Sequence, residues 1–284
     1  MIVAIASGKG GTGKTTVAAN LARRISESGR PTQLLDCDVE EPNCHIFVRP
    51  SIESSETVHV PVPEVDEELC TLCGECARVC QFNAIACLKK SVLVFPELCH
   101  GCAGCWLVCP AGAITPGGRD VGVVEKGEAS GFAFVQGRLR VGEAMSPPLI
   151  RAVKKEIDTA RTCLIDAPPG TSCPVIEAVK GSDFLVLVTE PTPFGLNDLR
   201  LAVDMAREIG LPHGVVINRS GIGDGRLKEY CGTEGVDVLG EIPDDRRIAE
   251  AYSRGELAVD ALPEYRGRFD ALRATIEERV AELV

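Results

Sequence analysis

Eight of the fourteen cysteines in this 284-residue chain lie in two short runs with identical spacing, C-x2-C-x2-C-x3-C. The first run consists of Cys70, Cys73, Cys76 and Cys80, and the second of Cys99, Cys102, Cys105 and Cys109. Cysteine thiolates are the usual ligands of iron–sulfur clusters. Eight thiolates in this arrangement predict two 4Fe–4S clusters.

The spacing matches that of bacterial ferredoxins, in which the fourth cysteine of each run ligates the other cluster. This crossed pattern assigns one cluster to Cys70, Cys73, Cys76 and Cys109. It assigns the other to Cys99, Cys102, Cys105 and Cys80. Gln81 stands where the second run has Pro110, so we expect both clusters to be retained and one to have an altered potential.

Structural zinc is the alternative reading of paired cysteines. Zinc sites usually combine two separated C-x2-C pairs per ion. Four cysteines within eleven residues, present twice, favour iron–sulfur clusters instead.

A second chemical signal lies at Ser7–Thr16, where Gly8-x4-Gly13-Lys14-Thr15 fits the P-loop pattern. Glycines let successive backbone N–H groups face one anion, and the following helix start favours negative charge. Lys14 can reach the terminal phosphates and Thr15 can ligate Mg²⁺. A glycine-rich turn that binds nothing would leave both residues unexplained. The predicted nucleotide cradle consists of Gly8, Gly10, Gly11, Thr12, Gly13, Lys14, Thr15 and Thr16.

Short buried strands alternating with helices must position the P-loop. The pattern predicts strands at 2–6, 32–36, 162–166, 184–189, 214–218 and 236–242, and helices at 14–28, 148–160, 195–209, 245–254 and 265–283. Continuous Val/Ile/Leu strands alternating with helices are typical of a parallel sheet covered on both faces. We therefore predict an α/β fold with a doubly wound, mostly parallel sheet.

The strands ending at Asp36 and Asp166 are separated by far more residues than a parallel crossover needs. Prolines and glycines near 61–63 and 116–118 bracket the extra sequence. We predict a nucleotide-binding domain at 1–61 and 119–284, with a small α+β ferredoxin-like domain inserted at 62–118. The insert is expected to contain a hairpin of 84–88 and 91–95. A second hairpin, of 131–135 and 138–141 turning at Gln136-Gly137, is expected after it.

Lys9 precedes the glycines in Gly8-Lys9-Gly-Gly-Thr-Gly-Lys-Thr, which resembles the deviant Walker A motif of the MinD, ParA, Mrp and nitrogenase iron protein superfamily. The resemblance implies an ATPase that forms a homodimer with ATP at the interface, Lys9 reaching the nucleotide of the facing subunit and Lys14 acting in cis. Asp38 would position the attacking water, Asp36 would lie just behind the Mg²⁺ ligands, and Asp166 would be the Walker B aspartate.

The same resemblance implies that residues 166–170 form switch II and that four residues hold the adenine of ATP or ADP. These are Asn218, Arg219, Pro243 and Asp244. A plain turn between strand and helix would look much the same.

Cys173 lies seven positions after Asp166, where nitrogenase iron proteins carry a ligand of a cluster that bridges their dimer. The second ligand of those proteins has no counterpart between Val121 and Arg161. We therefore predict a small, partly buried cysteine in switch II, with a labile bridging cluster as the alternative. Cys37, Cys87 and Cys163 are expected in the core.

The net charge of −11 disfavours nucleic acid and anionic membranes as partners. No apolar run approaches the length of a membrane span, and the chain is expected in the cytoplasm.

The combined motifs resemble MinD-superfamily ATPases with an inserted ferredoxin domain. The expected function is ATP-dependent control of electron transfer through the two clusters to a redox partner protein. An Mrp-like carrier or scaffold for iron–sulfur clusters is the alternative, and a spatial regulator like MinD or ParA is disfavoured by the acidic charge.

Overall fold

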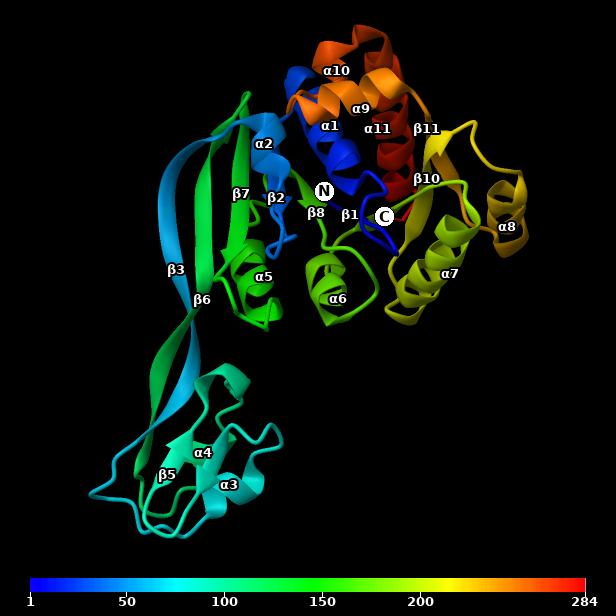
Figure 1. Cartoon of the computed structure of the whole chain (residues 1–284). Coiled ribbons are helices and arrows are strands. Elements are labelled where there is room, and N and C mark those ends of the chain that lie inside the picture. The colour runs from blue at the N-terminus through cyan, green and yellow to red at the C-terminus, as the bar shows by residue number, and fades with distance from the viewer. Residues whose placement is uncertain (284) are drawn as a thin grey trace.

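A nine-stranded sheet runs through the centre of the molecule (Figure 1), in a computed structural model that describes residues 1–283. The strand order is β11-β10-β9-β1-β8-β2-β7-β6-β3. All neighbours from β11 to β7 are parallel, while β7–β6 and β6–β3 are antiparallel. The predicted α/β fold with a mostly parallel sheet is therefore confirmed.

The parallel strands are short, and the four central ones, β1, β2, β8 and β9, are almost wholly buried, as their apolar composition predicts. The parallel strands are β1 (Ile2–Ala6), β2 (Thr32–Asp36), β7 (Phe132–Leu139), β8 (Thr162–Asp166), β9 (Phe184–Thr189), β10 (His213–Ser220) and β11 (Val238–Pro243). Their carboxyl ends lie at one edge of the sheet, which is where sheets of this kind bind ligands.

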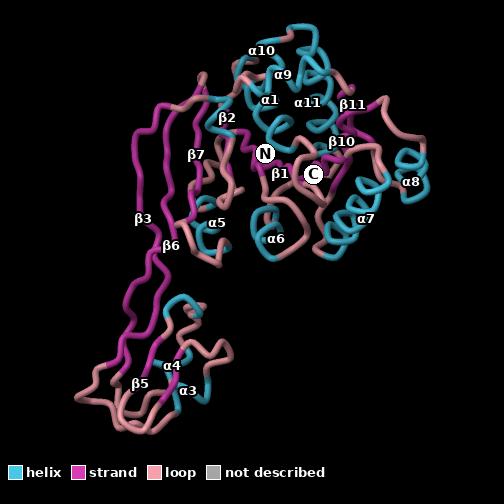
Figure 2. The backbone as a smooth tube through the Cα atoms, in the orientation of Figure 1, coloured by secondary structure: helices cyan, strands magenta, loops and turns pink. Residues whose placement is uncertain are grey.

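Helices cover both faces of the sheet, as Figures 1 and 2 show. One core contains α5 (Pro147–Lys154), α6 (Cys173–Val179), α7 (Pro193–Glu208) and α8 (Arg226–Glu234). The opposite core contains α1 (Lys14–Glu27), α2 (Cys44–Val48), α10 (Ala258–Ala261) and α11 (Arg266–Ala281), with α9 (Arg246–Ser253) beside them. Among residues 1–283, no helix has both the length and the apolar character needed to cross a membrane.

Two long antiparallel strands connect the sheet to a small distal unit. They are β3 (Ser51–Val65) and β6 (Ile114–Ala129). Their inner halves belong to the main sheet, where β6 pairs with β7 from Gly122 to Ala129. Their outer halves, residues 59–65 and 114–120, pair with each other and leave the sheet as a two-stranded ribbon (Figure 2).

The ribbon leaves the sheet at a β-bulge. Val58 pairs with Gly122, but His59 pairs with Asp120, so Val121 has no counterpart on β3. A bulge of this kind bends the strand and increases its twist. The residues that were expected to bracket the insert, Pro61, Pro63 and Pro116-Gly117-Gly118, lie inside the ribbon beyond the bulge.

The distal unit, residues 66–113, is called the cysteine module below, and residues 1–58 and 121–283 the body. The module contains α3 (Glu75–Val79), α4 (Gly104–Leu107), the 3₁₀ turn Pro96–Leu98 and a hairpin of β4 (Ile85–Cys87) and β5 (Val92–Val94). This hairpin confirms the prediction for 84–95.

The second predicted hairpin is wrong. Gln136-Gly137 lies inside β7, and the turn is Ser130-Gly131, both with positive φ, between the paired residues Ala129 and Phe132. Glycine is needed at 137 because a Cβ there would stand 2.5 Å from the Val39 side chain. A glycine that allows close approach inside a strand was thus misread as a turn. The helix predicted at 148–160 also ends earlier, at Lys154.

Candidate functional site

The P-loop joins β1 to α1 and is shaped by left-handed glycines. Gly11 and Gly13 have φ of 77° and 98°, a region that L side chains rarely adopt. A Cβ on Gly13 would lie 2.2 Å from Nδ2 of Asn218, and one on Gly8 would lie 2.2 Å from the Asp198 carbonyl oxygen. The loop is therefore packed closely against Asn218 of β10 and Asp198 of α7, with no space for a side chain at Gly8 or Gly13.

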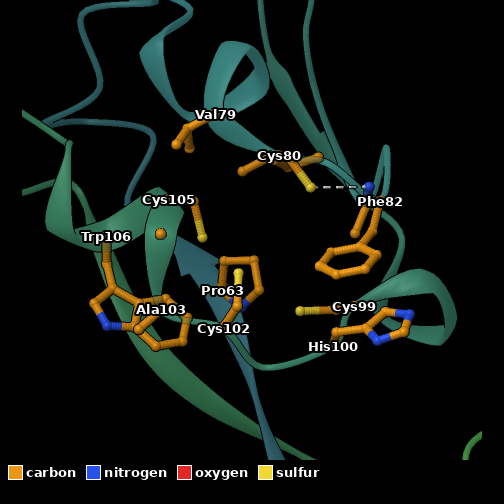
Figure 3. Close-up of a pocket in the computed structure, with 13 residues that line it drawn as sticks. Pro63, Val79, Cys80, Phe82, Cys99, His100, Cys102, Ala103, Cys105 and Trp106 are labelled. Atoms are coloured by element: carbon orange, nitrogen blue, oxygen red, sulfur yellow. Dashed lines mark hydrogen bonds between the residues drawn. The ribbon is translucent and has the colours of Figure 1, made fainter.

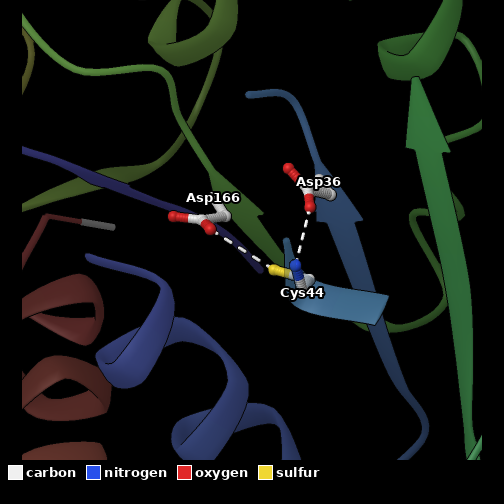
Figure 4. Close-up of side chains that lie close together, drawn as sticks. All are labelled: Asp36, Cys44 and Asp166. Carbon is white, nitrogen blue, oxygen red and sulfur yellow. Dashed lines mark hydrogen bonds between the residues drawn. The ribbon is translucent and has the colours of Figure 1, made fainter. Parts of the chain in front are cut away.

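Asp166 reaches the start of α1 from the end of β8. Its Oδ2 accepts hydrogen bonds from the Thr15 hydroxyl at 2.6 Å and from the Cys44 thiol at 3.3 Å (Figure 4). Its Oδ1 is buried and has no hydrogen-bond partner within residues 1–283. Burial raises the pKa of this carboxyl. The hydrogen bond from Thr15 lowers the pKa, but by less than burial raises it.

Asp36 stands beside Asp166 at the end of β2 and is fully buried. Its carboxylate accepts three backbone N–H bonds, from Asp38 at 3.1 Å, Asn43 at 3.0 Å and Cys44 at 2.9 Å. Burial, and then the negative charge of Asp166, raise the pKa of Asp36 well above its ordinary value. Ligand atoms of Asp36, Cys44 and Asp166 lie within 4.8 Å of one another.

The oxygen atoms of Asp36, Asp166 and Thr15 are suitable ligands for a divalent cation. Two buried carboxyls in one place are unfavourable without a compensating charge. Asp166 also has an unpartnered oxygen, and the Thr15 hydroxyl is a common Mg²⁺ ligand in P-loops. Mg²⁺ would therefore be held by Thr15, with Asp166 and Asp36 close behind.

Asp38 follows β2 and is half-buried at the same edge of the sheet. Burial raises its pKa to about 6, and the nearby charge of Lys14 opposes this shift. Lys14 is itself 6% exposed and lowers the pKa of Asp166 as well. The structure thus brings Lys14, Thr15, Asp36, Asp38 and Asp166 together, as predicted from the sequence.

Lys9 is placed differently from the other predicted residues. Its ammonium lies 3.8 Å from Glu190, and the Arg219 guanidinium lies 3.0 Å from the other oxygen of that carboxylate. The Glu190 side chain is only 9% exposed. The sequence analysis did not predict Glu190, although its position directly after β9 was a usable signal.

The predicted adenine residues lie at the ends of β10 and β11. Asn218 donates from Nδ2 to the Thr12 carbonyl at 2.7 Å, so it braces the P-loop in this structure. Asp244 is exposed and its amide donates to the Ser220 carbonyl at 3.0 Å. Pro243 ends β11 beside Ser220. Arg219 has a positive φ of 53° and lies at an irregularity of β10, where the pairing with β11 shifts between Ile217 and Ser220.

The cysteine module contains two cavities, each lined by three cysteines of one run and the fourth cysteine of the other. The first cavity is lined by Cys70, Cys73, Cys76 and Cys109. The second is lined by Cys99, Cys102, Cys105 and Cys80, and Figure 3 shows the Cys80, Cys99 and Cys105 sulfurs directed into the same space.

The backbone around these thiols also suits a bound cluster. The amide of Ala84 donates to the Cys80 sulfur at 3.3 Å, and that of Gly101 to the Cys99 sulfur at 3.4 Å. Leu72 and Gly101 stand at equivalent places in the two runs, as do Gly74 and Ala103, and all four residues have positive φ. The two runs therefore fold alike, and the donor set fits two 4Fe–4S clusters.

Two further cysteines depart from expectation. Cys87 lines the first cavity beside the four predicted ligands, whereas it was expected in the core. Cys173 is exposed at the start of α6, so the prediction that it is partly buried is wrong.

Comparison with known proteins adds independent information. The model of the CobQ/CobB/MinD/ParA nucleotide binding domain matches residues 3–259. An uncharacterised protein of Methanocaldococcus jannaschii is 32% identical over 286 residues, which cover 98% of this chain and 96% of the relative. The iron–sulfur cluster carrier protein of Aquifex aeolicus is 28% identical over 93% of this chain and 63% of its own length.

Among solved structures, the septum site-determining protein MinD of Pyrococcus horikoshii, complexed with Mg-ADP, superposes with a TM-score of 0.58. The identity is 21%, over 95% of this chain and 93% of the MinD chain. A likeness at this identity concerns the fold.

Proposed function

The chain belongs to the CobQ/CobB/MinD/ParA family of nucleotide-binding domains, and from this premise we propose that it is a homodimeric ATPase whose nucleotide state controls two 4Fe–4S clusters. The clusters would be held in the cysteine module and would exchange electrons with a partner protein. The observation that carries the proposal is the pair of cavities, each with four cysteines drawn from both runs.

Hydrolysis is assigned to the edge of the sheet around the P-loop. Lys14 and the loop amides would neutralise the charge of the phosphates, and Thr15 would hold Mg²⁺ with Asp166 behind it. Asp38 would orient a water in line with the γ-phosphorus. The bond from phosphorus to the bridging oxygen breaks as the bond to the water oxygen forms, so positioning and charge do most of the work.

Lys9 would act on the nucleotide of the facing subunit. In the single chain it rests against Glu190, a contact that a second copy carrying ATP would have to replace. We therefore place the dimer interface on the P-loop edge, with Lys9 released from Glu190 as the two copies close.

When bound, a 4Fe–4S cluster supplies a site that takes up and releases a single electron. The residues of the module hold it, shield it with apolar side chains and donate N–H bonds toward its cysteine sulfurs. Such donors raise the potential of a cluster. The N–H bonds to Cys80 and Cys99 both fall on the second cavity, so its cluster is expected at the higher potential.

The crossed arrangement can be tested with two double variants in anaerobically purified protein. Cys70→Ala with Cys109→Ala removes two ligands from the first cavity and none from the second. We expect this variant to lose half of its iron and acid-labile sulfide, and to retain one cluster with an unchanged EPR signal upon reduction.

The matched control is Cys70→Ala with Cys80→Ala, which removes one ligand from each cavity. It should disturb both EPR signals while the first variant disturbs one. If the two double variants behave alike, the crossed assignment is wrong. Stoichiometric zinc without sulfide in the wild-type protein would overturn the cluster proposal itself.

Coupling between the two sites is tested by anaerobic redox titration with and without Mg²⁺ and ATP. Nucleotide should shift the potential of at least one cluster, and cluster reduction should change the ATPase rate. If the potentials ignore ATP and the ATPase rate ignores reduction, the redox role is refuted.

A cluster carrier is the second candidate, favoured by the relatives named iron–sulfur cluster carrier protein. Cys73 and Cys102 are both exposed, which would give an acceptor access to each cavity. This function predicts transfer of iron and sulfide to an apo-ferredoxin within minutes of mixing. Clusters that stay bound through such an incubation would exclude it.

A further inference from the structure

The body and the cysteine module meet through the ribbon, and the residues next to the ribbon also contact the segment that carries Asp38. Residues 140–146, called the linker loop here, connect β7 to α5 and lie between the two. A structural change caused by nucleotide binding could be passed to the module through this loop, because the loop contacts both the segment after Asp38 and the ribbon.

On one side, the linker loop is joined to the segment that follows Asp38. The amide of Leu139, at the end of β7, donates to the Val39 carbonyl at 2.9 Å. The Ser146 hydroxyl donates to Oε1 of Glu40 at 2.8 Å, and Ser146 is buried. A movement of Asp38 toward a γ-phosphate would therefore pull on both ends of the loop.

On the other side, the linker loop contacts the ribbon at Arg119 and Val121, where the ribbon leaves the sheet. Glu143 forms an ion pair with Arg119, and the two side chains are 1% and 6% exposed. The amide of Arg140 donates to the carbonyl of Val121, the bulged residue at which the ribbon leaves the sheet, at 2.9 Å. Both contacts fall at the bend between body and module.

The Arg119–Glu143 pair has unused hydrogen-bond donors that would allow a second arrangement. Glu143 uses Oε2 for Arg119 and Oε1 for the Met145 amide, at 2.9 Å. Nε and Nη2 of Arg119 are buried and have no hydrogen-bond partner in the part of the chain that the structure describes. Buried guanidinium nitrogens are rarely left unpaired. Rotation of the linker loop could release Met145 and give both oxygens to Arg119 as a bidentate pair.

We propose that the linker loop transmits the nucleotide state from Asp38 to the ribbon, by switching Glu143 between these two arrangements and so changing the angle at Val121. This inference rests on the proposed ATPase function. It assigns Ser146, Glu143 and Arg119 as positioning residues that act on the module through the ribbon.

The test is hydrogen exchange of the full-length, cluster-loaded protein, measured by mass spectrometry with Mg²⁺ and either ADP or a non-hydrolysable ATP analogue. In the wild-type protein, exchange in residues 8–16 should be slower with the analogue than with ADP. Exchange in residues 114–121 and 140–146 should also differ between the two nucleotides. In Ser146→Ala and in Glu143→Gln, the first effect should persist and the second should be lost. Ser146→Thr, which keeps the hydroxyl, should restore it.

Two matched controls act on the same β6–β7 pair away from the ribbon. Ser26→Ala removes a hydroxyl bond to the Gly131 carbonyl at the opposite end of the pair, and Glu125→Gln removes the charge that pairs with Arg138 and keeps an amide oxygen for the bond from Gln136. Both should keep the response of the ribbon. The inference is overturned if the analogue protects residues 8–16 while the ribbon is unchanged, or if Ser146→Ala responds like the wild type. If residues 8–16 are not protected, the ATPase proposal fails and this inference falls with it.

Discussion

At the scale of single residues, Asp166 has two oxygens in different situations. One is satisfied by Thr15 and Cys44, and the other is buried without a partner in the described chain. In the nucleotide-free protein this is an unfavourable charge next to Asp36, which a bound cation would relieve. The site is therefore built for its ligand at the expense of the stability of the empty protein.

Replacing Asp166 with Asn should stabilise the nucleotide-free protein by about 0.5–2 kcal/mol, because it removes a buried charge and leaves an oxygen for Thr15. It should also lower the hydrolysis rate by roughly 100-fold or more. Thermal unfolding and phosphate release measure the two effects. Asp158→Asn is the control, since the Ala160 amide and Arg161 lower the pKa of that carboxyl and its loss should not stabilise. A destabilised Asp166→Asn protein would contradict this account.

Asp38 gives a pH dependence with a definite sign. Its pKa in the folded protein is raised from 3.8 to about 6, so the folded state binds the proton more tightly than the unfolded state. The contribution of Asp38 to stability is therefore fully present below about pH 3.8 and is lost as pH rises through about 6. The free energy of unfolding of the wild type, relative to Asp38→Asn, should fall across this window in denaturant titrations. A difference that does not vary with pH would refute the shift.

At the scale of elements, the P-loop depends on close packing against β10. Gly13→Ala would force a Cβ onto Asn218 and strain a left-handed residue, so ATP affinity should fall by more than roughly tenfold. Gly29→Ala is the matched control. Gly29 has φ of 79°, but no atom of residues 1–283 lies within 4 Å of a Cβ placed there, so that variant should lose about 1 kcal/mol of stability and keep its affinity. Isothermal titration with ATP compares them, and equal affinities would contradict the packing argument.

How far the elements could be predicted depends on how local their signals are. β1, β2, β8 and β9 were predicted with their observed bounds, because continuous apolar runs ending in turn residues leave little choice. β3 and β6 were not, because a ribbon with prolines and glycines looks like a series of loops, and β7 was not, because Gly137 inside the strand looks like a turn. In β3 those prolines are tolerated since one side of the strand is a free edge.

The candidate sites also divide into residues that local spacing predicts and residues that depend on contacts between distant segments. The cysteine runs and the P-loop have fixed spacing, so the sequence named all eight cysteines of the two runs and the residues of the loop. It did not name Cys87, which also lines the first cavity, or Cys44, which lies against Asp36 and Asp166. Glu190 and the Arg119–Glu143 pair depend on contacts between segments far apart in the chain. Nothing local to either residue of that pair signals that the other will lie beside it.

At the scale of the whole molecule, the body and the cysteine module have separate cores. The buried apolar residues of the module are few, and half of them are cysteines: Cys76, Ala84, Ile85, Cys99, Cys105 and Ala113. A unit of this size rarely folds on its own core, so bound clusters would supply much of its stability.

Removal of iron with an anaerobic chelator should therefore unfold the module and spare the body. Amides of residues 66–113 should exchange at unprotected rates, while the body keeps its melting temperature in calorimetry. The control is the same treatment of a protein purified without iron, which should show no further change. A single transition that shifts as a whole upon iron removal would contradict this separation.

One consequence follows from the place of β3 at the margin of the sheet. On its outer side, its fifteen residues pair with no other strand of residues 1–283, and a free edge of this kind is a surface on which proteins aggregate by adding strands. The strand bears Glu53, Glu56 and Glu64 and no lysine or arginine, and Pro61 and Pro63 interrupt its donors. Negative charge and proline at the edge of a sheet both disfavour the addition of a further strand. We therefore expect the long arm that extends toward the cysteine module to resist fibril-like self-association.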